Sequence, residues 1–451
     1  MVHTSRETQE VSLFSSSRRK AVAGAALAVL LTTAACGGSD DSADAAGDYD
    51  PDAPVTLTVG TFGTMDFDNA GLYDEYMELH PNVTIKQNNI AQSAAYYKSL
   101  QTRLAAGSGL DDIQALEIGF IADVVQNHSD AFVDFAAEDN AEELKGNFYD
   151  WKWGQASTDD GKTVGLGTDS GPQAMCYRKD LFGQAGLPTD REQVGQLWSS
   201  WEQYLDVARQ YKTATGKPFL DSPASVFSSS VYQGDEAYND EDGNPIPEDS
   251  SGVKTAWGLA SQAASEGLTA NLKQFGDEWN AAFSNGAFAT IACPAWMLGY
   301  INSQMGDAGT GLWDIAPLPG ASESASNWGG SFLGVPAEGE NVEAAKDLAE
   351  WLTAPEQQIK LFTETAHFPS SPQAAEDPQV VDATNAYFSG APTGQIFGAA
   401  AENIKRTPIG PYDTQIQDAF TTALTDVAAN GTDPDEAFDN AVKAANQAIG
   451  G

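Results

Sequence analysis

The sequence predicts an α/β protein of two domains, and two observations lead to this prediction. Between Val55 and Gln126, short apolar runs alternate with segments of helical periodicity. Alternation at this spacing indicates a parallel sheet with helices covering both faces. The second observation is length: removing a predicted leader of 35 residues from the 451 leaves 416, which is more than one hydrophobic core usually carries.

Each element follows from a local pattern. Apolar runs of strand length occupy 55–60, 83–87 and 112–118, with amphipathic helices predicted at 69–80 and 94–106. Further helices are expected at four later segments that begin with capping residues or end at glycine, namely 198–211, 342–352, 414–429 and 434–448. The strands thus alternate with helices in the first part of the chain, and helices dominate its last part.

The N-terminus has the composition of an export signal. Basic residues at 18–20 precede an apolar run at 21–31 and then small residues. The run is well short of the roughly 20 residues that a membrane-spanning helix needs. Ala34-Ala35-Cys36 resembles the bacterial lipobox, which implies cleavage before Cys36 and a lipid on it; an ordinary signal peptide is the alternative. Residues 1–35 are therefore predicted to be a lipoprotein signal peptide, exported by the Sec or the Tat route, and 36–53 a flexible tether rich in Gly, Ser and Asp.

Charge excludes one class of partner. The predicted mature chain keeps 19 of the 23 basic residues and 62 of the 64 acidic ones, for a net charge of −43. Such a surface repels nucleic acid and anionic lipid. Nucleic-acid binding is therefore not expected, and the excess of acidic residues is interpreted as solvation.

Cysteines support export. Of the three cysteines, Cys36 is assigned to the lipid, which leaves Cys176 and Cys293. Two remaining cysteines in an oxidising compartment are expected to pair. We therefore predict a Cys176–Cys293 disulfide.

Catalytic and metal-binding motifs are missing from the sequence. The four histidines are scattered, and no HExxH, GxSxG, complete GxGxxG or CxxC motif occurs. No cofactor, no metal site and no enzymatic activity are expected. A glycosidase remains the alternative, because abundant acidic residues could supply a pair of catalytic carboxylates.

The most informative stretch is 281–300. A helix ends at Asn285-Gly286, a short apolar strand follows at 288–292, and Pro294 stops it. Trp296 comes directly after, and ligands of α/β proteins lie beyond strand ends; a core position is its alternative. Together with Trp328 beside Gly329-Gly330, Trp296 would suit stacking on the apolar face of a sugar ring.

Several segments resemble the extracellular solute-binding proteins of bacterial ABC sugar importers, the maltose-binding-like group. The matching segments cover nearly all of 55–448: DIQALE at 112–117, AMCYRKDLFGQAGLP at 174–188, FSNGAFATIACPAW at 283–296, WGGSFLGVP at 328–336 and AAKDLAEWLTAPEQQIKLF at 344–362. The resemblance implies a two-lobed periplasmic-binding-protein-like fold with a cleft between the lobes and three hinge crossings, expected at 165–171, 289–293 and 327–333. The first lobe would comprise 54–167 and 293–328, and the second 168–292 and 329–451.

The same resemblance implies a set of ligand-binding residues. Glu117 matches an acidic position after a strand, where a carboxylate can accept hydroxyls of a sugar, and Trp296 matches a stacking tryptophan. Tyr177 is placed by the resemblance in either cleft or core. The full predicted set is Phe62, Thr64, Glu117, Asp169, Trp296, Trp328, Gly330 and Tyr412.

The function implied is that of a lipid-anchored, monomeric receptor on the extracellular face of the cytoplasmic membrane. It would capture a di- or oligosaccharide, first of all cellobiose or cellotriose, and deliver it to the ABC permease subunits. Xylo-oligosaccharides, chitobiose and polyamines are alternative ligands.

Overall fold

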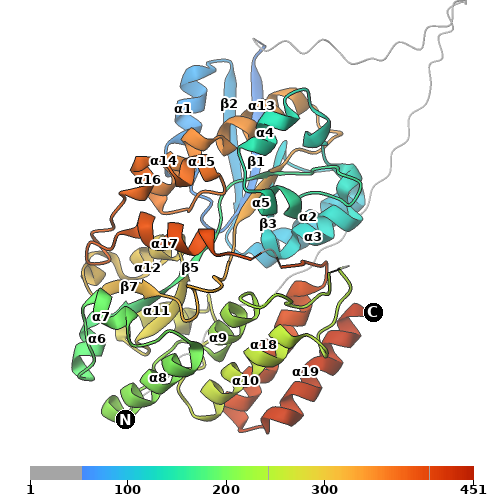
Figure 1. The fold of residues 1–451 in the computed structure, drawn as a ribbon. Coiled ribbons are helices and arrows are strands. Elements are labelled where there is room, and N and C mark those ends of the chain that lie inside the picture. Colours follow the sequence, from blue (N-terminus) through green and yellow to red (C-terminus); the bar gives the residue numbers. More distant parts are fainter. Residues whose placement is uncertain (1–52, 242, 406, 451) are drawn as a thin grey trace, which may run out of the picture. The chain divides into compact units, whose positions relative to one another are not determined.

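The computed structural model describes residues 53–241, 243–405 and 407–450 (Figure 1). The predicted signal peptide, the lipidation site Cys36 and residues 36–52 of the predicted tether lie outside this part of the chain. The described chain contains two sheets, each packed against its own helices, and we call the region around each sheet a lobe.

The first sheet has five strands in the order β2-β1-β3-β8-β4. They span Val55–Phe62 (β1), Val83–Ile90 (β2), Ile113–Glu117 (β3), Leu166–Gly167 (β4) and Ser331–Gly334 (β8). β1 pairs in parallel with β2 and β3, because helices α1 (Leu72–Leu79) and α2 (Ser93–Ala106) carry the chain back across the sheet. The predicted parallel sheet is therefore correct for these strands.

One strand of the first sheet, β8, runs in the opposite direction to the other four. β8 pairs antiparallel with β3 and with β4. The prediction of an entirely parallel sheet is wrong here, because β8 is reached from the second lobe rather than through a βαβ crossover. No local pattern in 331–334 reports that direction.

The second sheet is antiparallel and has the order β6-β5-β7, with β5 at Gln173–Arg178, β6 at Thr290–Pro294 and β7 at Trp313–Pro317. Its strands are buried along nearly their whole length. Cys176 of β5 and Cys293 of β6 form a disulfide with Cα atoms 5.8 Å apart. The predicted disulfide is confirmed, and it joins two neighbouring strands of this sheet.

Helices surround both sheets (Figure 1). Those that follow strands of the first sheet, besides α1 and α2, are Ile118–Asn127 (α3), Ala141–Gly146 (α4), Asp150–Gln155 (α5), Val342–Thr353 (α13) and Pro355–Thr365 (α14), with 3₁₀ turns at Ser129–Ala131 and Phe135–Ala137. The second lobe has Lys179–Gln184 (α6), Arg191–Gly195 (α7), Trp201–Thr215 (α8), Pro223–Val231 (α9), Ser251–Ser265 (α10), Asp277–Asn285 (α11), Met297–Met305 (α12) and a 3₁₀ turn at Gly306–Gly309. After α14 come Pro372–Ala375 (α15), Pro378–Val381 (α16), Thr393–Glu402 (α17), Asp413–Asn430 (α18) and Pro434–Ile449 (α19).

Helix ends follow the predicted local chemistry. The carboxylate of Asp433 caps α19 by accepting from the backbone N–H groups of Asp435 and Glu436. Gly286 ends α11 in the left-handed conformation, with φ of 67°. Both positions were expected from residue type, because a carboxylate satisfies free N–H groups and glycine adopts positive φ without a Cβ clash.

The chain passes between the two sheets at three places. The first lies between β4 and β5, the second between β7 and β8, and the third after α14. Hydrogen bonds tie these crossings together: Ser170 N–H donates to the Phe368 carbonyl at 2.7 Å, and Trp328 N–H to the Gly171 carbonyl at 2.8 Å. The three crossings thus lie side by side.

Two of the three predicted crossing positions agree with this path, and one is wrong. Residues 290–294 form β6, which pairs with β5 along its length, so the chain does not change lobe there. The third crossing is at 367–371 instead. The exact lobe boundaries remain a prediction, but two strands differ from the predicted division: β7 pairs within the second sheet and β8 within the first.

Candidate ligand-binding site

A cavity of about 390 Å³ lies where the two lobes meet the crossings. From the first lobe it is lined by residues at or just beyond the carboxyl ends of β1, β2 and β3: 62–65, 91–93 and Glu117. Open α/β sheets bind ligands at this edge, because the loops there converge. The other side is formed by the second lobe and the crossings.

Four large rings make one side of the cavity, which we call the aromatic wall: Phe275, Trp296, Tyr300 and Trp328. The Trp296 and Trp328 rings have centroids 5.4 Å apart in a T-shaped arrangement, and the Trp296 indole N–H donates to the Trp328 carbonyl at 2.9 Å. Phe275 lies 5.6 Å from Tyr300 and 6.1 Å from Trp328. Ring–ring contacts therefore hold each face in a fixed direction.

Local sequence explains how two of these rings reach the cavity. β6 ends at Pro294, and Trp296 is the residue immediately before α12. Tyr300 is four residues further along the helix, so it lies on the same face as Trp296. The strand end and the helical spacing were both visible in the sequence, but Tyr300 was not predicted.

Phe275 is the residue that sequence reasoning could not find. It belongs to a loop, its side chain is 38% exposed, and its φ is 62°. A positive φ is unusual for a bulky residue and marks local strain, which is found at functional positions. Neither a periodic pattern nor a turn motif in the sequence indicates that Phe275 lines the cavity.

Hydrogen bonds to a buried carboxylate, Asp221, hold the loop that carries Phe275. Asp221 is fully buried and accepts from the Trp279 indole N–H at 2.9 Å and from Ser225 Oγ at 2.7 Å. The Gln274 amide, next to Phe275, donates to Asp221 at 3.3 Å and to Ser225 Oγ at 2.9 Å. These bonds fix the backbone on which the Phe275 ring stands.

The opposite side, which we call the polar wall, comprises Thr64, Gln92, Ser93 and Glu117. The Glu117 side chain caps α3, accepting from the Gly119 N–H at 3.0 Å. Burial raises the pKa of Glu117 to about 7; the Gly119 N–H and the charge of Lys152 lower it, and Asp169 raises it further. Hydroxyl groups of a ligand would find acceptors here.

The crossings form the floor of the cavity. Asp169 accepts from Thr168 Oγ at 2.7 Å and from the Ser331 N–H at 2.9 Å, so it joins the first crossing to the start of β8. Gly330 has φ of 94°, and a Cβ there would lie 2.9 Å from both the Asp169 carbonyl and Lys152 Nζ. The close approach of the crossings therefore requires glycine at this position.

Seven of the eight predicted ligand-binding residues line this single cavity: Phe62, Thr64, Glu117, Asp169, Trp296, Trp328 and Gly330. Tyr412 does not; it stands at the start of α18 and packs against the second-lobe core. Tyr177 is fully buried and its hydroxyl donates to the Thr189 carbonyl at 3.1 Å, so it faces the core. Lining residues that were not predicted include Met65, Gln92, Phe275, Tyr300, Leu361 and His367.

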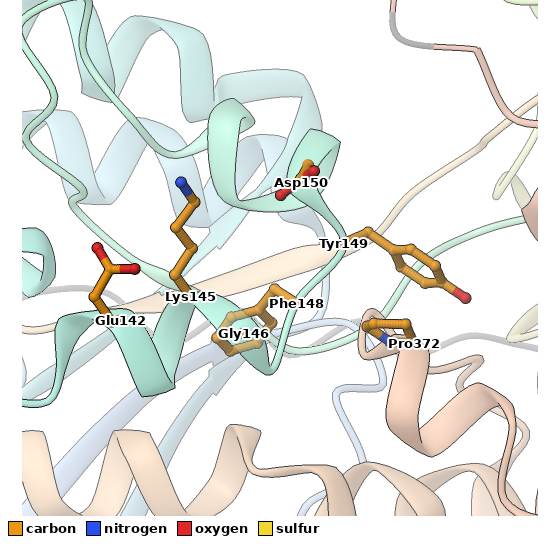
Figure 2. Close-up of a pocket in the computed structure, with 7 residues that line it drawn as sticks. All are labelled: Glu142, Lys145, Gly146, Phe148, Tyr149, Asp150 and Pro372. Carbon is orange, nitrogen blue, oxygen red and sulfur yellow. The ribbon is translucent and has the colours of Figure 1, made fainter.

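A second hollow, of about 430 Å³, lies elsewhere, at the turn between α4 and α5 (Figure 2). Glu142 and Lys145 project from α4 into solvent, and the Tyr149 ring lies close to Pro372. This hollow has neither the group of aromatic rings nor a buried carboxylate. Its chemistry is that of an ordinary surface, so the first cavity is the better candidate.

The described part of the chain was searched for a metal site and for a membrane-spanning helix. Among the residues that the structure describes, no cluster of three or more His, Cys, Asp or Glu side chains is arranged to hold a metal ion. In that same part of the chain, no helix combines the length and the apolar character needed to span a membrane.

Two lobes, three adjacent crossings and a lined cavity between them define a binding protein of the two-lobed periplasmic type. The family model of bacterial extracellular solute-binding proteins matches residues 71–388, and the chain belongs to this family. A solved structure described as an extracellular solute-binding protein of family 1 is 40% identical, with a TM-score of 0.77, and the match covers 88% of this chain and all of that one.

Curated relatives are more distant. A lactose-binding protein of Rhizobium radiobacter is 24% identical over 376 residues, which cover 80% of this chain and 85% of the relative. An arabinooligosaccharide-binding protein of Halalkalibacterium halodurans is also 24% identical, over 76% of this chain and 78% of its own. The ABC-transporter-associated binding protein of B. animalis subsp. lactis in complex with β-1,6-galactobiose shares the fold at 19% identity and a TM-score of 0.73, and the match covers 87% of this chain and 96% of that one.

Proposed function

We propose that this protein is the extracellular receptor of an ABC importer and that it captures a di- or oligosaccharide for delivery to the permease. The observation that carries the proposal is the pairing of the aromatic wall with the polar wall across one cavity. Aromatic rings stack on the apolar faces of pyranoses. Carboxylate groups accept hydrogen bonds from the sugar hydroxyls, and amide groups both accept and donate them. Relatives named for lactose and arabinooligosaccharides support the same ligand class.

Charge around the cavity disfavours an anionic ligand. Among the described residues that line it, none is Lys or Arg, while Glu117 and Asp169 supply carboxylates. An anionic ligand would meet no compensating charge in the lining. Of the neutral candidates, cellobiose and cellotriose come first, because CPAWM at 293–297 and NWGGSF at 327–332, which contain Trp296 and Trp328, resemble segments of cello-oligosaccharide receptors. Xylo-oligosaccharides and chitobiose come next.

Closure of the lobes is the proposed mode of capture. A ligand that touches both walls adds contacts in the closed state that the open state lacks, and it therefore shifts the population toward closure. The three crossings would serve as the hinge. We further propose that the protein acts as a monomer, held to the membrane by a lipid on Cys36.

Titration calorimetry on the protein from residue 37 onward tests the ligand. Cellobiose, cellotriose, xylobiose, chitobiose and lactose are compared, and at least one is expected to bind with saturable heat and to raise the melting temperature. Spermidine in the same assay tests the polyamine alternative. If every saccharide fails both measurements, the receptor proposal is wrong; release of nitrophenol from an aryl glycoside would instead favour the glycosidase.

A separate experiment tests the anchor. Cells fed a labelled fatty acid should incorporate it into the wild-type protein but not into the Cys36→Ser variant, which should appear in the medium. Labelling of both proteins, or of neither, contradicts the lipid on Cys36.

A further inference from the structure

Lys152 is a buried cation that lies behind the candidate site without lining it. It belongs to α5, and the residue is 1% exposed. Its Nζ lies 3.8 Å from the centre of the Phe332 ring on β8. A buried ammonium is costly unless opposite charges or ring faces compensate it, so this position calls for an explanation.

The side chain of Lys152 lies against Gly167, where the first crossing begins, and Gly330 of the second crossing. A Cβ at Gly167 would lie 2.9 Å from Cγ and Cε of Lys152, and also 2.9 Å from Ser370 Oγ on the third crossing. A Cβ at Gly330, on the second crossing, would lie 2.9 Å from Lys152 Nζ. The ammonium is therefore held directly under the floor of the cavity, at the hinge.

Two carboxylates of the cavity lie next to Gly330, the glycine that approaches Lys152 Nζ: Glu117 is the register partner of Ser331, and the Ser331 N–H donates to Asp169 at 2.9 Å. Glu117 comes from the end of β3 and Asp169 from the first crossing, and the charges of both favour the protonated amine. Burial has the larger effect and lowers the pKa of Lys152 to about 8. In return, the positive charge of Lys152 opposes the effect of burial on Glu117, whose pKa stands at about 7.

Other charged or titratable groups near Glu117 come from the second lobe and the lining. The Tyr232 phenol, just after α9, faces Glu117 and Asp413, and burial raises its pKa well above the usual range, so it stays neutral. His367, on the third crossing, lies 3.9 Å from Asp66 in the loop after β1. Lys152 is the cation whose field acts on Glu117 from behind.

We propose that Lys152 is a positioning residue that keeps Glu117 ionised, so that the Glu117 carboxylate can accept ligand hydroxyls at neutral pH. The inference rests on the proposed function, because it needs Glu117 to contact the ligand. Lys152 acts through the low-dielectric floor between the crossings and touches no ligand itself. Its positive charge offsets part of the effect of burial on Glu117, to which repulsion by Asp169 adds.

The pH dependence of saccharide affinity tests this role. In the wild type, affinity should fall as pH drops below about 7, because protonation of Glu117 removes the charged acceptor. In K152M the midpoint of this fall should move to higher pH. For each unit by which the pKa of Glu117 exceeds the working pH, the carboxylate population falls about tenfold. K152M should therefore bind weakly at pH 7 and regain affinity near pH 9.

Three variants separate this electrostatic role from a structural one. K152R keeps the charge, so its acid midpoint should match that of the wild type. E117Q should abolish the decrease in saccharide affinity at low pH. The double variant E117Q/K152M should then show no such decrease either. If K152M does not fold, K152Q replaces it with the same expected shift.

The outcomes also distinguish the inference from the proposed function. A K152M or K152Q variant that binds more weakly by the same factor at every pH, with an unshifted midpoint, overturns the role of Lys152 and leaves the receptor proposal intact. Wild-type protein that binds no saccharide at any pH overturns the receptor proposal itself.

Discussion

The polar wall and the aromatic wall differ in how their side chains are held. Thr64, Gln92, Ser93 and Glu117 lie at or just beyond the carboxyl ends of three strands of the first sheet, β1, β2 and β3. The rings of the aromatic wall instead hold one another: Phe275 contacts Trp296, Tyr300 and Trp328. One wall is positioned by backbone topology and the other by mutual packing.

Because of this difference, we expect the two walls to contribute differently to affinity and to selectivity. The aromatic wall is expected to supply most of the affinity, because stacking buries apolar area and requires little further ordering. The polar wall is expected to supply selection among sugars, because an unmatched buried acceptor is costly. The decrease in affinity below about pH 7 is expected to come from the polar wall, since Glu117 lies there.

Trp296→Ala should have the largest effect on binding. Loss of this ring removes a stacking face and the hydrogen bond to the Trp328 carbonyl. We expect a loss of about 1–3 kcal/mol, or about 5- to 150-fold in affinity by calorimetry. Trp351→Ala is the matched control, because Trp351 packs in the first-lobe core and does not line the cavity. Unchanged affinity in Trp296→Ala would remove it from the site.

Glu117→Gln should have a smaller effect that depends on pH. The amide keeps one acceptor, so affinity at pH 8 should fall by about 1 kcal/mol. The decrease in wild-type affinity below about pH 7 should disappear, while Trp296→Ala should keep it. If Glu117→Gln still lost affinity below about pH 7 as the wild type does, another titrating group would be responsible for the decrease.

Phe275 offers a sharper test through two substitutions. Phe275→Ala and Phe275→Gly both remove the ring and should weaken binding by about 0.5–1.5 kcal/mol. Because φ is 62°, glycine should relieve strain that alanine retains, so the glycine variant should melt at the higher temperature. Equal melting temperatures would mean that the backbone there is not strained.

The disulfide should matter least for binding and most for stability. Cys176→Ala combined with Cys293→Ala removes a link between β5 and β6, which should cost about 2–4 kcal/mol in the free energy of unfolding. Trp296 stands outside the bonded strands, so affinity at 25 °C should change little. Denaturant titration and calorimetry on the same sample check both statements.

Much of the site was predictable because strand ends are marked locally. Glu117 ends β3, and Trp296 follows β6 after a proline, so each position could be found from short-range signals. Phe275 could not, because the bonds that fix it come from Asp221 and Ser225, about 50 residues away along the chain.

In the fold, too, local elements could be predicted from the sequence, whereas contacts between distant residues could not. Strands β1–β3 and their helices follow from local periodicity, and their parallel pairing follows from the helical crossovers. The third crossing depends on Ser170 meeting Phe368, 198 residues apart in sequence. Contacts of this range have no local signature, and the predicted crossing at 289–293 failed for this reason.

The position of β8 affects how the protein can be made. It lies between β3 and β4, yet it follows all three strands of the second sheet in the chain. A growing polypeptide that stops short of residue 331 therefore leaves β3 and β4 with no shared neighbour, and closing so long a loop is slow. We expect the first sheet of the nascent chain to stay incomplete until β8, which ends at residue 334 of 451, has been synthesised, and this would help to keep the chain unfolded for passage through a translocation channel.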